Sequence, residues 1–453
     1  MGRLLRRLAV VLFVLIVVAG VFMAVTVAPV NRVVKPGAPW QVQTMQYIDS
    51  VLSAPLPADT HRLMAGFGKA SITPSRPVAT AGYVKRKGAR FTAVRDTVFV
   101  RAAVIEKGGR RTAIVSLDML IVPPLLVEKL NEALHNTPFT PNMLYLSATH
   151  THNSIGQWDN HLVGEIYAGK YDKELVGFLL KQIKTALLSA LADVQPVALY
   201  YGQTAVSEAV VNRLVAGGAV DSLMHALQFA CADGSRAVVV SYPAHATCLS
   251  SKDLRLSADY PGELVTRLER GGYRFALFLA GAVGSHAPAP MPDGDAKIEF
   301  MAATLEKALH TTRFSPVQGS DLRLTHIPVA MPPQQVRLTA GWRIRPWLSE
   351  MLLGKSPVKL SVLQLGNTVF VGTPCDFSGM LTPPLYAAAR QHSLNICVTS
   401  FNGGYIGYIT PDELYDMNAY ETQIMNWYGP GNGAYLSGCI KNIISQTAQA
   451  GAY

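Results

Sequence analysis

Two histidines, His150 and His152, lie two positions apart directly after the apolar run Met143–Thr149. Residues i and i+2 of a β-strand point to the same face, so this spacing predicts two imidazoles side by side where a strand opens into a loop. Imidazole is the commonest metal ligand in proteins and a frequent acid or base. The plain alternative is a loop with two structural histidines.

Four further segments place chemically active side chains just past an apolar strand. These side chains are His245, Ser285 with His286, Asp376, and Tyr408 in a glycine-rich stretch. Two histidines and a carboxylate are a common ligand set for catalytic zinc, which keeps one coordination position for water. Zinc lowers the pKa of that water toward about 7 and polarises a carbonyl. Packing or capping roles are the alternative for each residue taken alone.

The elements that must position these residues alternate between strands and helices. Apolar runs predict strands near residues 64–74, 97–106, 112–122, 143–149, 197–201, 223–231, 236–242, 274–279, 322–331, 361–371 and 396–401. Helical spacing predicts helices near residues 45–56, 124–135, 173–193, 261–270, 295–309, 383–392 and 435–448. Several strands are apolar throughout, which is typical of burial on both faces. We therefore predict an α/β fold with mixed, largely buried sheets flanked by helices, where ligands bind at strand ends.

The N-terminus has a different character from the rest of the chain. Arg3, Arg6 and Arg7 precede an uncharged apolar run over residues 8–28. About 20 apolar residues can cross a bilayer as a helix, and arginines in front of them keep the N-terminus in the cytoplasm. We predict a signal-anchor or transmembrane segment over residues 1–28, a stalk over 29–62 and one large domain over 63–453. The alternative is a cleaved signal peptide, which would make the protein secreted; both interpretations put the body outside the cytoplasm, in the periplasm or the extracellular space.

Composition narrows the class of protein. The 453 residues are 49% hydrophobic and 15% charged, as in a globular protein. The formal net charge is +10, but the basic residues are dispersed, so no nucleic-acid partner is predicted. An anionic membrane surface suits this charge better. The five cysteines form no C-x-x-C pair, and we expect most of them to be small buried residues.

Over roughly residues 63–450 the chain resembles the neutral (alkaline, non-lysosomal) ceramidases. The segments that carry the resemblance are Ile72-Thr73-Pro74, Ser116-Leu117-Asp118, Thr149-His150-Thr151-His152, Ala244-His245-Ala246, Ser257-Ala258-Asp259-Tyr260-Pro261-Gly262 and the stretch from Asn402 to Pro430. The resemblance implies a zinc-dependent amidase that hydrolyses the N-acyl bond of ceramide to sphingosine and a fatty acid. The family's full-length members also carry a C-terminal β-sandwich domain, which this chain is expected to lack.

The resemblance also implies roles for single residues. The expected Zn²⁺ ligands are His150, His245, Asp376 and Tyr408. His152 would lie beside the metal, contact the attacking water or the substrate, and move a proton. Arg213, in Val211-Asn212-Arg213, would contact the polar head of the substrate or the new carboxylate.

Two motifs depart from the family pattern. The family's metal carboxylate is a glutamate in Pro-Gly-Glu-Phe, whereas this chain has the shorter Asp376. The family's Gly-Asp-x-Ser-Pro corresponds here to residues 284–288, which puts Ala287 at the position of the reactive serine. Ser285 and His286 are then the candidates for the catalytic role at this loop.

The sequence thus predicts a membrane-tethered zinc hydrolase that acts on ceramide or a related N-acyl lipid through metal-activated water. Its predicted partners are the lipid substrate and, through the N-terminal helix, the membrane; protein partners stay open. One alternative is a hydrolase of a different N-acyl amide or an ester. Another is a lipid-binding relative that keeps the fold without catalysis.

Overall fold

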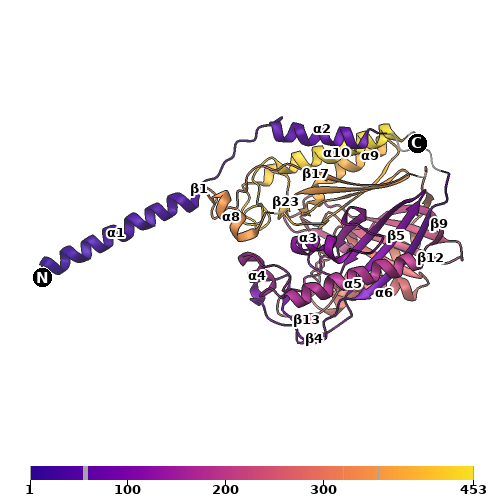
Figure 1. Cartoon of the computed structure of the whole chain (residues 1–453), viewed down its shortest axis with the longest axis horizontal. Coiled ribbons are helices and arrows are strands. Elements are labelled where there is room, and N and C mark those ends of the chain that lie inside the picture. The colour runs from indigo at the N-terminus through magenta and orange to yellow at the C-terminus, as the bar shows by residue number, and fades with distance from the viewer. Residues whose placement is uncertain (1, 55–59, 320, 356, 452–453) are drawn as a thin grey trace.

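Two β-sheets stack face to face, and helices cover the outer face of each, which gives four layers (Figure 1). The computed structural model describes residues 2–54, 60–319, 321–355 and 357–451. The expected α/β fold with mixed sheets flanked by helices is confirmed.

The larger sheet has nine strands, in the order β14-β12-β11-β9-β2-β5-β6-β7 with β16 beside β9. Its strands are β2 (Met64–Ser71), β5 (Phe99–Lys107), β6 (Arg110–Leu117), β7 (Leu144–Ala148), β9 (Gln195–Ala205), β11 (Leu223–Cys231), β12 (Arg236–Tyr242), β14 (Phe275–Ala280) and β16 (Ser315–Pro316). The β6–β7 and β12–β14 pairs are parallel and the others antiparallel. Each parallel pair contains a strand that is followed by a predicted site residue.

The smaller sheet has the order β17-β19-β20-β22. Its strands are β17 (Leu322–Pro328), β19 (Lys359–Leu365), β20 (Thr368–Gly372) and β22 (Asn395–Thr399). The sequence predicts one strand over residues 361–371, and this is wrong. Gly366 and Asn367 form a two-residue turn, with Gly366 at φ +54°, and fold the segment into the β19–β20 hairpin.

Alternating side chains of the strands fill two different layers. In β5, Val104 packs under the helices of the larger sheet, while Ile105 faces the smaller sheet. Phe229 and Phe370 come from opposite sheets and share the layer between them. This arrangement confirms the prediction of strands buried on both faces, and it explains their nearly continuous apolar sequences.

Helices cover both outer faces. The larger sheet carries α3 (Pro124–Ala133), α5 (Lys173–Ala192), α6 (Asp259–Arg270) and α7 (Asp295–Thr311). The smaller sheet carries α2 (Pro39–Leu52), α9 (Pro383–Gln391) and α10 (Asn432–Ala450). Gly66 and Gly68 let α5 lie directly on β2, because a Cβ at either position would come within 2.4 Å of a backbone oxygen of α5.

Short strand pairs and two short helices lie outside the two sheets. The pairs are β1 (Val27–Pro29) with β18 (Trp342–Ile344), β3 (Thr80–Ala81) with β8 (Ser154–Ile155), β4 (Ala93–Val94) with β13 (Arg255–Leu256), β10 (Val210–Asn212) with β15 (His286–Pro288), and β21 (Asp376–Phe377) with β23 (Tyr408–Ile409). The helices α4 (Leu162–Ala168) and α8 (Pro346–Leu353) contact each other.

The segment expected to be a stalk is docked on the domain wherever it is described. Ile48 and Leu52 of α2 are fully buried, and Asp49 accepts hydrogen bonds from Asn442 and Gln446 of α10 at 2.8 and 2.9 Å. Residues 55–59 of this segment lie outside the described residues. The prediction of a stalk is therefore corrected. The apolar face of α2 is buried against α10 and is not exposed to solvent.

The first helix, α1 (Gly2–Thr26), stands away from the domain (Figure 1). Its best 18-residue window has a mean hydropathy of 3.2 and no buried residue. Helix α5 is also long and apolar enough to span a membrane, but its apolar face packs on the larger sheet. By length and composition, α1 can cross a bilayer, so the anchor stays a prediction.

Acidification is expected to destabilise the protein through the buried histidine His225. Its ring lies between the hydroxyls of Tyr201 and Tyr386 at 2.7 and 3.2 Å, and burial lowers its pKa from 6.5 to about 4. The unfolded chain therefore binds this proton more tightly, and stability is lost as the pH falls from about 6.5 to 4, by up to about 3 kcal/mol. Thermal unfolding at pH 7.5 and pH 4.5 would measure the loss. Its pH dependence should be weaker in His225→Gln and unchanged in His310→Gln, which alters an exposed histidine of α7.

Candidate active site

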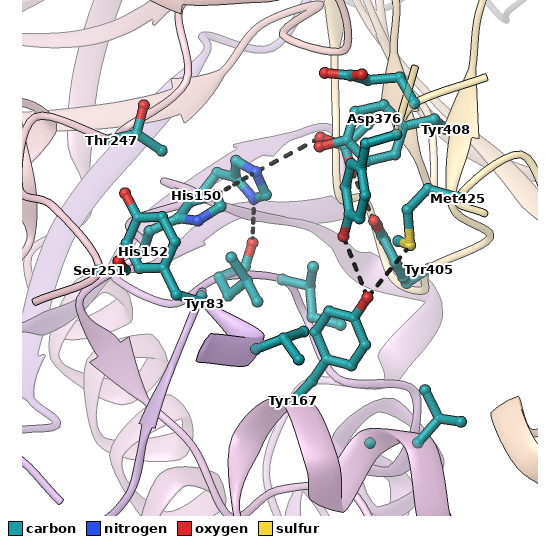
Figure 2. A pocket seen from close by; sticks show the side chains of 18 of the residues that line it. Tyr83, His150, His152, Tyr167, Thr247, Ser251, Asp376, Tyr405, Tyr408 and Met425 are labelled. Carbon is teal, nitrogen blue, oxygen red and sulfur yellow. Dashed lines mark hydrogen bonds and ion pairs between the residues drawn. The ribbon is translucent and has the colours of Figure 1, made fainter. Parts of the chain in front are cut away.

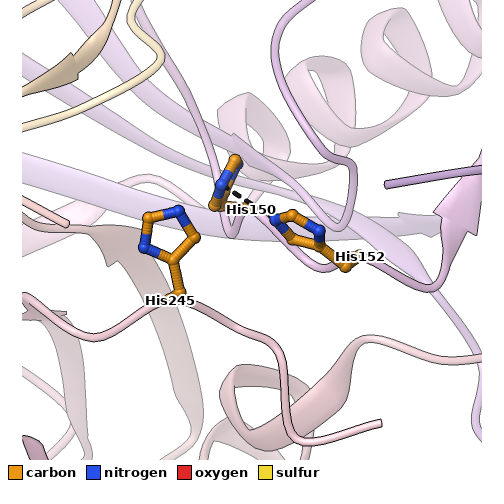
Figure 3. A group of neighbouring side chains, drawn as sticks. All are labelled: His150, His152 and His245. Atoms are coloured by element: carbon orange, nitrogen blue, oxygen red, sulfur yellow. Dashed lines mark hydrogen bonds between the residues drawn. The ribbon is translucent and has the colours of Figure 1, made fainter. Parts of the chain in front are cut away.

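His150 and His152 come together, but not as neighbours on one strand face. Strand β7 ends at Ala148, and His150 has a left-handed backbone with φ +62°. The Nε2 atoms of the two rings lie 3.1 Å apart, and His245 completes a three-histidine cluster (Figure 3). The predicted convergence is present, whereas the strand geometry from which it was predicted is wrong.

Backbone carbonyls fix the orientation of two of these rings. His150 Nδ1 donates to Leu120 O at 2.6 Å, and His245 Nδ1 donates to His286 O at 2.8 Å. Because a carbonyl only accepts, the proton of each neutral ring is on Nδ1 and Nε2 carries a free lone pair. The His150 ring also stacks on Phe401, with centroids 3.9 Å apart. Both Nε2 atoms are thereby held ready to bind a cation.

Asp376 and Tyr408 reach the same point from the side of the smaller sheet. They are direct partners in the parallel β21–β23 pair. Asp376 Oδ1 lies 3.2 Å from His245 Nε2 and 3.5 Å from His150 Nε2, and the Tyr408 hydroxyl lies 3.2 Å from His245 Nε2. The four residues expected to bind the metal therefore converge, although 258 positions separate the first from the last.

The chemistry of this donor set fits a metal ion. Asp376 Oδ1 is buried without a hydrogen-bond donor, and it faces two nitrogen lone pairs. Burial lowers the pKa of His150 to about 3 and that of His245 well below its usual range, so neither ring is a cation at neutral pH. Electron pairs that face one another repel unless a cation lies among them. Two imidazoles, a carboxylate and a phenol suit zinc, and the ring nitrogens of His150, His152 and His245 form an overlapping candidate set.

Two neighbours hold the oxygen ligands, and the sequence does not assign either role. The Tyr405 hydroxyl donates to Asp376 Oδ2 at 2.8 Å. Arg213 Nη2 donates to the Tyr408 hydroxyl at 3.0 Å, and Arg213 Nε pairs with Glu421 at 3.0 Å. Tyr405 lies in the glycine-rich stretch already singled out, which is the signal that could have found it. Glu421 has no comparable signal.

Ser285 and His286 lie behind the site, and their side chains are absent from the cavity wall. Ser285 Oγ accepts from Ser378 Oγ at 2.7 Å and lies 3.1 Å from His286 Nδ1. His286 Nε2 accepts the backbone N–H of Asp221 at 3.0 Å. These hydrogen bonds hold both side chains away from the histidine cluster. The backbone carbonyl of His286 does reach the site, because it accepts a hydrogen bond from His245 Nδ1.

A cavity of about 680 Å³ opens in front of the cluster (Figure 2). His150, His152 and Asp376 lie at its inner wall, and Arg213 also lines it. Most of the remaining wall is apolar or aromatic; examples are Ile121, Trp158, Tyr167, Met425 and Trp427. A largely apolar and aromatic cavity that contains the histidines and Asp376 suits an apolar ligand with a reactive polar group.

Tyr405→Phe is expected to weaken metal binding by roughly 10- to 100-fold, because it removes the hydrogen bond that orients Asp376. Competition with a chromogenic zinc chelator would measure the dissociation constant. Tyr415→Phe is the matched control, since the Tyr415 hydroxyl is buried without a hydrogen-bond partner and Tyr415 does not line the cavity. Equal zinc affinity of both variants and the parent would contradict the role given to Tyr405.

Comparison with known proteins finds similarity to the neutral/alkaline ceramidases. The family model of neutral/alkaline non-lysosomal ceramidase, N-terminal, matches residues 63–274. The neutral ceramidase of Pseudomonas aeruginosa is 26% identical over 254 residues, which make up 52% of this chain and 38% of that relative. The chain thus matches well under half of the length of this curated relative.

Solved structures extend the similarity to the fold. The crystal structure of neutral ceramidase from Pseudomonas aeruginosa has a TM-score of 0.73 at 19% identity, covering 87% of this chain and 76% of that one. A ceramidase complexed with C2 has a TM-score of 0.69 at 18% identity, covering 86% and 75%. The resemblance to the neutral/alkaline ceramidase family is confirmed, and the fold is shared along most of the chain.

Proposed function

We propose that this chain, a relative of the neutral/alkaline ceramidases, is a zinc-dependent amidase that hydrolyses the N-acyl bond of ceramide or a related N-acyl lipid. The observation that carries the proposal is the convergence of His150, His245, Asp376 and Tyr408, three of which line a largely apolar cavity; His245 lies directly behind them. The shared fold and the family match support the same reaction class.

The proposed reaction needs a nucleophile, a proton carrier and a counter-charge for the carbonyl oxygen. A zinc ion bound by the four ligands would supply a Lewis acid and an activated water. His152 lines the cavity, and burial holds its pKa well below the usual value, so the ring is neutral at pH 7. In this scheme His152 takes up the proton of the attacking water. It can then pass that proton to the leaving nitrogen.

Arg213 supplies positive charge next to the reacting group. Its guanidinium is bonded to Tyr408 and lines the cavity. There it can stabilise the developing oxyanion and afterwards the carboxylate of the released fatty acid. The apolar walls hold the acyl chain and exclude bulk water. Ser285 and His286 have a positioning role in this scheme, because only the carbonyl of His286 acts on a ligand.

Helix α1 is proposed to tether the protein to the membrane, with the domain outside the cytoplasm. Arg3, Arg6 and Arg7 precede its apolar run, which sets this orientation. The tether would keep the cavity at high effective concentration near a lipid substrate.

The test uses the purified full chain in detergent micelles that contain ceramide. Mass spectrometry should detect a free fatty acid and sphingosine in equal amounts. A chelator should abolish turnover, and zinc should restore it. His150→Ala should be inactive and free of zinc, while His310→Ala, on the exposed face of α7, should match the parent. Zinc-loaded protein that releases no fatty acid from any N-acyl lipid would refute the proposal.

One observation favours a second candidate, a hydrolase of another N-acyl amide or an ester. Ala287 lines the cavity at the position where the related family has its reactive serine, so a methyl group stands there instead of a hydroxyl. A panel of ceramides, other N-acyl amides and acyl esters would separate the two. Robust turnover of a different amide or ester without ceramide turnover would establish the second.

A further inference from the structure

Eight large apolar side chains stand out on the surface of the domain. Among the described residues from 35 onward, they are the large apolar side chains that are 47% exposed or more. They are Leu162, Ile166, Leu338, Trp342, Trp347, Met351, Tyr420 and Ile424. All eight come from three segments: helix α4, the stretch from residue 338 through α8, and the loop around residues 420–424.

These three segments adjoin one another, and we call their surface the apolar rim. Helices α4 and α8 are in contact. The hydroxyls of Tyr167 in α4 and Tyr420 lie 3.2 Å apart. Arg337, one residue before Leu338, donates to the carbonyl of Thr422. The eight exposed apolar groups gather on neighbouring segments, and such patches mark interaction sites.

The apolar rim borders the mouth of the cavity. Val163 and Tyr167 of α4 and Leu353 of α8 line the cavity, while their helix neighbours Ile166 and Met351 point out to solvent. Tyr420 belongs to both, since it lines the cavity and is 47% exposed. The rim and the cavity wall are therefore continuous along α4, α8 and Tyr420.

The rim also continues into the base of α1. Strand β1, which follows α1, pairs with β18 next to α8. Arg345 Nε and Trp347 Nε1 donate to the carbonyls of Ala24 and Val25, each at 3.0 Å, and so satisfy the last turn of the helix. Figure 1 shows α1 leaving the domain beside α8, with α4 on the same side. A bilayer that contains α1 would meet this side of the domain first.

We infer that the apolar rim inserts into the surface of the bilayer that holds α1, so that an N-acyl lipid passes from the membrane directly into the cavity. Tryptophan, tyrosine and arginine, which the rim and its base contain, are the residues that favour the membrane–water boundary. The inference deepens the proposed function and rests on it for the route of the substrate. The insertion itself requires no catalysis.

Fluorescence quenching in vesicles tests the insertion. All five native cysteines are buried, so a single new exposed cysteine can be labelled selectively. Ile166→Cys and Met351→Cys, in the full chain reconstituted into phosphatidylcholine vesicles, would carry an environment-sensitive fluorophore. Leu188→Cys on α5 is the control, because Leu188 is exposed at 38% and lies outside the rim. Lipids brominated on their acyl chains should quench the labels at 166 and 351 and leave the label at 188 bright.

Equal brightness of all three labels would overturn the inference. Disulfide cross-linking of Met351→Cys between two chains, without quenching by brominated lipid, would assign the rim to a second copy and would also overturn it. A turnover assay then tests the route. Ile166→Glu with Met351→Glu should lower hydrolysis of ceramide embedded in vesicles by roughly tenfold, and spare a short-chain, water-dispersed N-acyl substrate.

The quenching assay and the turnover assay can fail independently, so their results separate the insertion from the proposed function. Quenched labels without turnover of any substrate would refute the proposed function and keep the insertion. Normal turnover in vesicles by the double glutamate variant would refute the route of the substrate through the rim.

Discussion

His245→Ala should release the metal and lower hydrolysis by roughly three orders of magnitude, the largest loss expected from one substitution. The His245 ring is fully buried, and its Nε2 lies 3.2 Å from both Asp376 Oδ1 and the Tyr408 hydroxyl. No other side chain stands at hydrogen-bond distance from both oxygen ligands among the described contacts. Its loss therefore removes one ligand and separates the other three.

Zinc content by mass spectrometry and turnover of an N-acyl lipid would be measured on the same preparation. His326→Ala is the matched control, because that histidine is half-buried and desolvation lowers its pKa to about 4, but it lies in β17 away from the cavity. It should lose stability and keep its zinc. Full zinc content in His245→Ala would show that the ligand set is wrong.

Gly284→Ala should disrupt the site without touching any ligand side chain. A Cβ at residue 284 would stand 2.4 Å from the carbonyl oxygen of Asp376 and 2.9 Å from its carbonyl carbon. Both atoms are backbone, so either the loop or strand β21 has to move. We expect a loss of about 1–3 kcal/mol in the free energy of unfolding. Displacement of Asp376 should also weaken zinc binding by roughly 10- to 100-fold.

Thermal unfolding and zinc affinity would be compared with Gly177→Ala. Gly177 is an exposed residue of α5 with open space at the Cβ position, so alanine there should raise stability by up to about 1 kcal/mol. If Gly284→Ala melts at the parent temperature and binds zinc equally well, the loop and Asp376 are not in tight contact.

Most elements of the fold could be predicted from the sequence because the strands are buried on both faces and the helices on one. Continuous apolar runs give β6 and β12, and a helical period gives α5 and α10. The β19–β20 hairpin could not be separated into two strands, because its turn is only two residues long and apolar runs flank it closely. The stalk was mispredicted because the apolar face of α2 has its partner, α10, nearly 400 residues away.

Prediction of the site depended on the family resemblance more than on spacing. Nothing in the sequence between His150 and Tyr408 states that the two residues meet; the pairing of β21 with β23 and the stacking of two sheets bring them together. The left-handed backbone of His150 is invisible in a sequence pattern. Tyr405 was missed because a buried tyrosine usually packs, and its bond to Asp376 depends on tertiary structure alone.

The ligands of the proposed metal site come from both sheets. His150 and His245 follow β7 and β12 of the larger sheet, whereas Asp376 and Tyr408 follow β20 and β22 of the smaller one. The set of four expected ligands is complete only after the two sheets have docked, whereas His150, His152 and His245 all follow strands of the larger sheet. In the proposed set, Asp376 and Tyr408 therefore join the two histidines only at a late step of folding. If the ion needs all four ligands, the ions present where folding finishes select the metal that the mature protein carries.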